Sequence, residues 1–187
     1  MTSEQEPNDW AVYQGIEDAL RAYLRDADVA LEAVLGVVDA ASIQAFTCER
    51  VSTPTLDGDS LWQEVAVTDG RRLILWHGDD EETDDGDPAF SSSLRTVPLS
   101  AIVDQGLRIR YSIDESGARS LDAVLLYLAT QTPERASTEL TDDAGTRTTQ
   151  FVETYRFSKS VTDGGRGQMQ RLMQFGREIS HSVARAE

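Results

Sequence analysis

Cysteine and histidine are scarce in this chain: its 187 residues include one cysteine, Cys48, and two histidines. A single cysteine excludes an internal disulfide and zinc sites built from several cysteines. Long apolar runs are also missing, because none approaches the roughly 20 residues of a membrane-spanning helix. The first ten residues are polar and acidic, unlike a secretory signal. We therefore expect a cytoplasmic protein.

Positive charge is scarce as well. The chain has 17 Lys and Arg residues against 33 Asp and Glu residues, a formal net charge of −16, and Lys159 is its only lysine. Nucleic acids and anionic lipid surfaces bind proteins through clusters of basic residues. We therefore expect no nucleic-acid, membrane or phosphoinositide partner.

Length and composition are typical of one folded domain. Hydrophobic residues make up 40% of the chain and charged residues 27%, which is ordinary for a globular protein. A chain of 187 residues is long enough for one sizeable core. We expect a disordered N-terminus at residues 1–8 and a single domain over residues 9–187.

The stretch from Ser60 to Asp79, SLWQEVAVTDGRRLILWHGD, predicts the central hairpin of the fold. Its two apolar segments meet at Asp69-Gly70, and Asp-Gly favours a two-residue turn because both positions need a positive φ. The first arm alternates between two faces, with Leu61, Val65 and Val67 on one and Trp62, Glu64 and Thr68 on the other. Leu73–Trp76 is apolar on both faces, as in a central strand.

Five further segments complete the seven strands that we expect over residues 42–158. They are Ser42–Val51, Leu94–Ile102, Leu107–Ile113, Leu121–Leu128 and a last strand marked by Phe151, Tyr155 and Phe157. Leu121–Leu128 is rich in leucine and also permits a helix. We expect a loop at Thr53–Ser60, and a polar insertion at Thr130–Arg147 with a short extra strand near Ala136–Leu140.

Helices are expected at both ends of the domain. Over residues 9–40, one helix begins after Asn8 or Asp9, and a second runs from Ala27 to Val38. The first has an apolar stripe at Tyr13, Ile16, Leu20 and Leu24. A closing helix at residues 166–185 buries Met169, Leu172, Met173, Gly176, Ile179 and Val183.

These elements predict an α+β protein whose antiparallel strands form a sandwich or partly open barrel. Seven such strands plugged by a C-terminal helix resemble the pleckstrin-homology-like fold. VAVTDGRRLILWHGD is similar to the second hairpin of bacterial pleckstrin-homology-like domains, and RTVPLSAI is similar to their next strand. Members that bind phosphoinositides use Lys and Arg between the first two strands, but Ser52–Ser60 contains neither.

A closer resemblance is to an uncharacterised actinobacterial family, a domain of unknown function. It covers most of residues 20–185 and is carried by LEAVLGVVDAASIQAF, the central hairpin, VPLSAIVDQGLRI and MQRLMQFGREIS. The resemblance implies Cys and His between the last two strands. Thr130–Arg147 has neither, so a metal role does not carry over to this chain.

The most conspicuous polar segment is Asp79–Asp87, DDEETDDGD, which has seven acidic residues and no basic one. A calcium loop needs carboxylates at fixed spacing and a glycine at its sixth position. Counting from Asp80 places Asp85 there, and counting from Glu81 places Thr83 where a carboxylate is needed. We interpret the run as a solvated, mobile extension of a hairpin.

No motif predicts catalysis, a metal site or a cofactor. Gly164–Gly167 lacks the Gly-Lys-Ser/Thr of a phosphate loop and is interpreted as a hinge. Cys48 is interpreted as a small buried hydrophobe rather than a reactive thiol. No Gly-x-Ser-x-Gly turn is present to hold a nucleophilic serine.

We therefore expect a non-catalytic pleckstrin-homology-like module that binds a protein partner or associates with itself. The candidate partner-binding residues are Trp62, Trp76 and His77. Trp62 is out of phase with Leu61 and Val65, so either it faces a partner or the N-terminal helices cover it. The alternative function is a small-molecule binder or enzyme that uses a cavity in the barrel.

Overall fold

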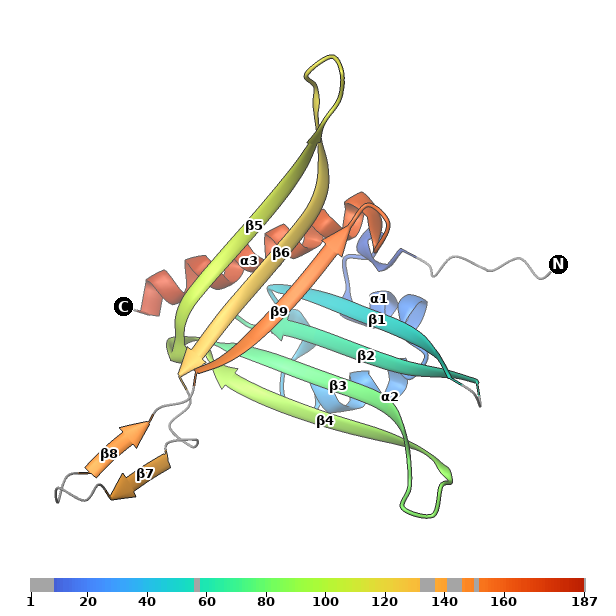
Figure 1. The fold of residues 1–187 in the computed structure, drawn as a ribbon, viewed down its shortest axis with the longest axis vertical. Helices are drawn as coiled ribbons and strands as arrows, with labels where there is room; N and C mark the ends of the chain where they lie inside the picture. Colours follow the sequence, from blue (N-terminus) through green and yellow to red (C-terminus); the bar gives the residue numbers. More distant parts are fainter. Residues whose placement is uncertain (1–8, 56–57, 132–136, 141–145, 150–151, 187) are drawn as a thin grey trace.

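Residues 9–55, 58–131, 137–140, 146–149 and 152–186 are described by a computed structural model of the chain. In them the strands form two antiparallel sheets and a short separate pair (Figure 1). The first sheet runs in chain order: β1 (Ala45–Thr55), β2 (Gly58–Thr68), β3 (Arg72–Glu82) and β4 (Pro88–Pro98). The second sheet places β6 (Arg119–Gln131) between β5 (Ile102–Ile113) and β9 (Val152–Ser160), and the separate pair is β7 (Ser137–Leu140) with β8 (Thr146–Thr149).

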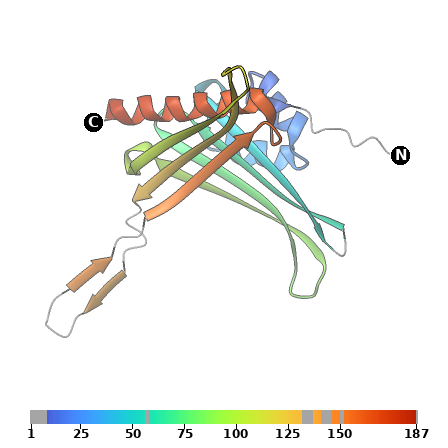
Figure 2. The ribbon, with the colours of Figure 1, turned by 45° about the horizontal axis from the view of Figure 1, so that its top comes forward.

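The helices lie at the two ends of the chain. The 3-10 turn η1 (Trp10–Val12) leads into α1 (Ile16–Tyr23), α2 (Ala27–Leu35) and η2 (Ala40–Ser42), and η3 (Leu99–Ala101) joins the two sheets. The last helix, α3 (Gly165–Ala186), lies along the second sheet, while α1 and α2 lie against the first (Figure 2). Across the described helices, none has both the length and the apolar character needed to cross a bilayer.

The first sheet separates two apolar cores. One face packs against α1 and α2, where Val65 and Ile74 meet Leu20 and Leu31. The other face turns toward the second sheet and α3, where side chains with at most 9% exposure gather, among them Leu73, Leu75, Leu126, Leu128, Phe157, Leu172 and Phe175. A strand covered on both sides needs apolar residues on both faces, which explains the continuous apolar run in β3.

Most of the predicted elements are confirmed. The central hairpin turns at Gly70, whose φ is +79°. The leucine-rich segment is strand β6, the seven principal strands are all present, and β7 occupies the predicted extra strand. The closing helix is also present, and Gly176 lets it approach the second sheet, because an added Cβ there would lie 3.1 Å from Cδ1 of Leu126.

Two predicted loops are wrong. Thr53–Ser60 is largely strand, because β1 continues to Thr55 and β2 begins at Gly58, with Val51 opposite Trp62 in the ladder. The acidic run is not entirely a loop either, since β3 continues to Glu82 opposite Pro88. In both segments the paired strands extend past the apolar core. Their ends have few buried side chains, so no apolar pattern in the sequence predicts the pairing.

The first predicted helix is also wrong in its extent. Asp9 caps only η1, through a 3.0 Å hydrogen bond from the amide of Ala11, and the α-helix starts at Ile16. Gly15 precedes it in an extended conformation. Residues 1–8 and part of the Thr130–Arg147 insertion lie outside the described residues.

Candidate functional site

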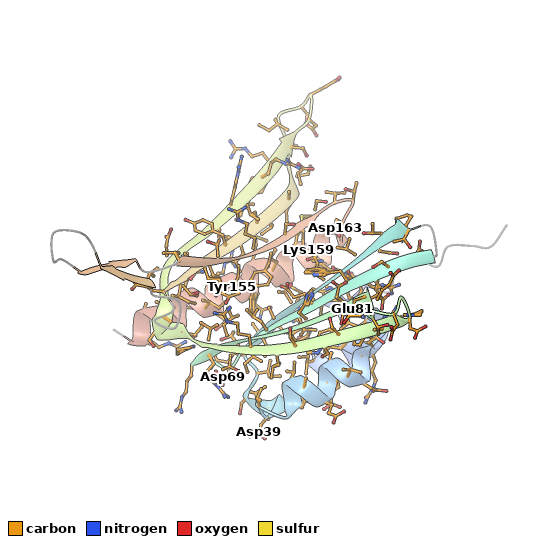
Figure 3. The ribbon with its side chains drawn as sticks, turned by 60° about the horizontal axis from the view of Figure 1, so that its bottom comes forward. Asp39, Asp69, Glu81, Tyr155, Lys159 and Asp163 are labelled. Atoms are coloured by element: carbon orange, nitrogen blue, oxygen red, sulfur yellow. The ribbon has the colours of Figure 1, made fainter. Side chains whose placement is uncertain are left out.

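The inner face of the first sheet is crossed by strand β9. At one end of the crossing, Nζ of Lys159 lies 3.1 Å from Oε2 of Glu49 in β1. At the other end, Arg95 of β4 forms an ion pair with Glu153, and its guanidinium lies 5.6 Å from the ring centroid of Tyr155. Figure 3 shows Tyr155 and Lys159 in the space between the two sheets. The polar contacts therefore follow a diagonal from β4 to β1.

Lys159 is the most unusual residue of this crossing. Its side chain is fully buried, although a lysine ammonium is strongly hydrated in water. It is held by Glu49 and lies 5.9 Å from the ring centroid of Tyr23. Burial of such an ion pair is costly, so its two partners depend on each other strongly.

A second carboxylate, Glu64, lies beside this ion pair. Glu64 is opposite Glu49 on one side of β2 and opposite His77 on the other. The pKa of Glu64 is raised to about 7, chiefly by burial and also by the charge of Glu49, against the lowering effect of Lys159. Burial also raises the pKa of Glu49, against the lowering effect of Lys159. Glu64 therefore changes its charge near neutral pH, beside the ion pair of Lys159 and Glu49.

Trp62 and His77 lie next to the cluster, where the first sheet extends beyond β9. Their ring centroids are 5.4 Å apart and both side chains are half-buried. Trp62 is opposite Val51, which is 46% exposed, and opposite Asp79. Two of the three predicted partner-binding residues are thus brought together on one face. This face is the one turned away from α1 and α2, so the N-terminal helices do not cover Trp62.

Trp76 does not belong to this surface, and its prediction as a partner-binding residue is wrong. It is fully buried on the opposite face of β3, within the core under α1 and α2. Its Nε1 donates a 2.8 Å hydrogen bond to Oγ of Ser92. Adjacent residues of a strand point to opposite faces, so Trp76 and His77 cannot share one surface.

The acidic run has both a structural and an exposed part. Asp80 accepts hydrogen bonds from Nη1 of Arg25 at 2.8 Å and from the amide of Leu61 at 3.0 Å. The hydrogen bonds from Arg25 lower the pKa of Asp80. Residues 81–87 are exposed. The solvated extension that we expected therefore begins only after Asp80.

Cys48 has the packing role that the sequence suggested. It is a buried free cysteine, and burial raises the pKa of its thiol. Gly164 and Gly165 have φ values of +80° and +66°, which glycine adopts readily, and they form the connection before α3, while the hinge stays a prediction.

Sequence reasoning missed the buried cluster, although one signal was present. Tyr155, Phe157 and Lys159 recur every second residue, which places the lysine on the same face as two aromatic side chains. A lone lysine on an otherwise apolar strand face implies a buried partner of opposite charge. Nothing local identified that partner as Glu49, because it comes from a different sheet.

The site suits recognition of a positively charged group better than covalent chemistry. It combines paired aromatic rings with several carboxylates, and its one amine is buried in an ion pair. Over the described part of the chain, no group of three His, Cys, Asp or Glu side chains is placed to hold a metal ion. Comparisons with models of known families, with curated proteins and with solved structures find no match to this chain.

Proposed function

We propose that this protein is a non-catalytic binding module of pleckstrin-homology-like architecture. The arrangement that supports this architecture is a sheet of four antiparallel strands, followed by a sheet of three and a C-terminal helix packed against the second sheet. The module binds a basic, extended segment of a protein partner on the inner face of the first sheet. We define this surface, the binding face, as Val51, Trp62, Glu64, His77 and Asp79.

One observation carries the proposal: the rings of Trp62 and His77 contact each other in a tilted arrangement, with a ring-centroid distance of 5.4 Å. They lie on the face of the first sheet, which extends beyond β9 (Figure 1). Tryptophan is one of the residues enriched among the few that contribute most of the binding energy at the centres of protein interfaces. Val51, its cross-strand neighbour, is 46% exposed, so Trp62 has an apolar neighbour at the surface.

The charge around the patch indicates the chemistry of the partner. Glu64 and Asp79 lie beside the rings, and the exposed acids of the β3–β4 hairpin continue from them. A Lys or Arg side chain of a partner would meet these carboxylates and could stack on Trp62 by a cation–π contact. Self-association through this face is disfavoured, because each copy carries a net charge of −16.

The alternative, a small-molecule binder or enzyme with a cavity between the sheets, has less support. Beneath the crossing of β9, the space is occupied by apolar side chains. Leu126, Leu128 and Phe175 are fully buried there, and Phe157 is 4% exposed. A filled interior favours binding on the exposed part of the sheet over binding in a cavity between the sheets.

Selection from a random peptide library, displayed on phage and applied to the folded protein at physiological salt, tests the proposal. We expect the enriched peptides to be rich in Lys and Arg and to bind Trp62→Ala at least tenfold more weakly, as for the loss of a central interface residue. Tyr111→Ala is the matched control, because Tyr111 is an aromatic residue with 51% exposure outside the binding face. Peptides without a basic bias, equal binding to Trp62→Ala, or no enrichment would each overturn the proposal.

A further inference from the structure

A separate pocket shares no lining residue with the binding face. Its volume is about 320 Å³, and it is enclosed by the first turn of α1, the start of β1 and the middle of α3. Arg171 and Gln174 line it from α3, and Gln14 and Gln44 line it from the segments that precede α1 and β1. This volume is at the small end of the range for ligand pockets, roughly 300–1,000 Å³.

Arg171 is the one basic residue that lines this pocket. Its guanidinium lies 4.7 Å from the ring centroid of Phe46 and 5.9 Å from that of Trp10. Nη2 donates a 3.1 Å hydrogen bond to the carbonyl oxygen of Tyr13, while Nε is buried without a hydrogen-bond partner. The aromatic rings therefore fix the orientation of the planar group.

Within the described residues, Arg171 forms no ion pair, although the chain has 33 acidic and only 17 basic residues. Burial of the guanidinium lowers the pKa of Arg171, which reflects the cost of removing this cation from water. A half-buried cation without a counter-ion is costly, so an anion from solution would relieve the cost.

We propose that this pocket binds a small molecule that carries a single carboxylate, with Arg171 as its charged anchor. A guanidinium presents two parallel N–H donors that match the two oxygens of a carboxylate. The amides of Gln14, Gln44 and Gln174 supply further hydrogen-bond donors at the wall of the pocket.

The acidic residues of the pocket narrow the class of ligand. Glu17 and Asp18 also line it, from the first turn of α1. Two carboxylates disfavour a dianion such as phosphate, and they attract an ammonium group. The pocket therefore selects, among small carboxylates, those that also carry an ammonium, which is the chemical class of free amino acids.

Thermal unfolding and tryptophan fluorescence test this proposal without knowledge of the natural ligand. The probes are the free amino acids, the same carboxylic acids without the amino group, and inorganic phosphate, all at equal ionic strength. We expect at least one amino acid to raise Tm saturably and to change the fluorescence of Trp10, with the plain acid weaker and phosphate without effect. No saturable response to any carboxylate would refute the proposal, and a stronger response to phosphate would refute the ligand class.

Variants locate the site. Arg171→Gln removes the anchor and should abolish the response, whereas Arg177→Gln, an exposed arginine of the same helix, should retain it. Because Arg171 packs on two rings, near-ultraviolet circular dichroism checks that its variant is folded. The double variant Glu17→Gln with Asp18→Asn keeps the contacts of Arg171 with the two rings. It should bring the affinities for the amino acid and the plain acid to within about twofold of each other. Retained binding in Arg171→Gln, or unchanged discrimination in the double variant, would contradict the assignment.

Discussion

Replacing Glu64 by Gln should stabilise the protein, and the gain should grow as the pH rises. The folded state holds the Glu64 carboxyl with a pKa of about 7, against an ordinary value of 4.5, chiefly because burial penalises its charged form. Between these two values the folded chain binds a proton that the unfolded chain has released. Stability therefore falls as pH rises through this window and levels off above pH 7.

The size of the effect follows from the shift. One pKa unit corresponds to 1.36 kcal/mol, so a rise from 4.5 to about 7 costs up to about 3 kcal/mol once Glu64 is charged. About 1 kcal/mol of this penalty is already present at pH 5, so the gain of the Gln variant over the wild type should increase by about 2 kcal/mol between pH 5 and pH 8.5. The amide has nearly the shape of the carboxyl, so packing should change little.

Urea unfolding at steps between pH 5 and pH 8.5 measures this, and it stays above the isoelectric point near 4.4. Glu82→Gln is the matched control, because it removes the same charge from the exposed end of β3. The buried-carboxyl argument is refuted if the unfolding free energies of the wild type and of Glu64→Gln change with pH in parallel. It is also refuted if Glu82→Gln gains as much stability as Glu64→Gln.

Three other perturbations test separate parts of the structure. Lys159→Met leaves Glu49 buried without its cation and should cost about 3–5 kcal/mol in urea unfolding, and the double variant with Glu49→Gln should recover most of that loss; a single variant as stable as the wild type contradicts the ion-pair argument. Truncation after Gly165 removes α3, whose buried side chains each contribute roughly 1.5–3 kcal/mol, so calorimetry should show no cooperative transition; a transition near the full-length Tm would show that α3 is dispensable. Replacing Thr83–Asp87 with a Gly-Ser turn should leave Tm within about 2 °C of the wild type, because all five residues are exposed. Millimolar calcium, compared with EDTA, should raise the Tm of neither the wild type nor this loop variant. A rise in the wild type alone would show that the acidic hairpin binds metal.

Much of the fold is determined locally. The positive φ at Gly70 fixes the turn of the central hairpin. Alternation of apolar and polar residues along a strand predicts which of its faces is buried, and hence its register. Gly176 in the closing helix also predicted a close approach to a sheet, and the short distance to Leu126 confirms it. These features follow from backbone geometry and side-chain period, which are properties of neighbouring residues.

The candidate site was predictable only in part. The alternation along β2 places Trp62 and Leu61 on opposite faces of the strand. It does not say which of these faces the N-terminal helices cover. The same alternation separates His77 from Trp76, so grouping these two residues ignored information that the strand period supplies.

The pairing within the buried charge cluster was decided by tertiary structure. Lys159 and Glu49 lie in different sheets and are 110 positions apart in sequence. They meet only because β9 crosses the first sheet diagonally, and burial rather than residue type raises the pKa of Glu64. Which carboxylate pairs with the single lysine, and which tryptophan remains accessible, depend on how the two sheets pack, because packing of distant segments sets both distance and solvent exposure.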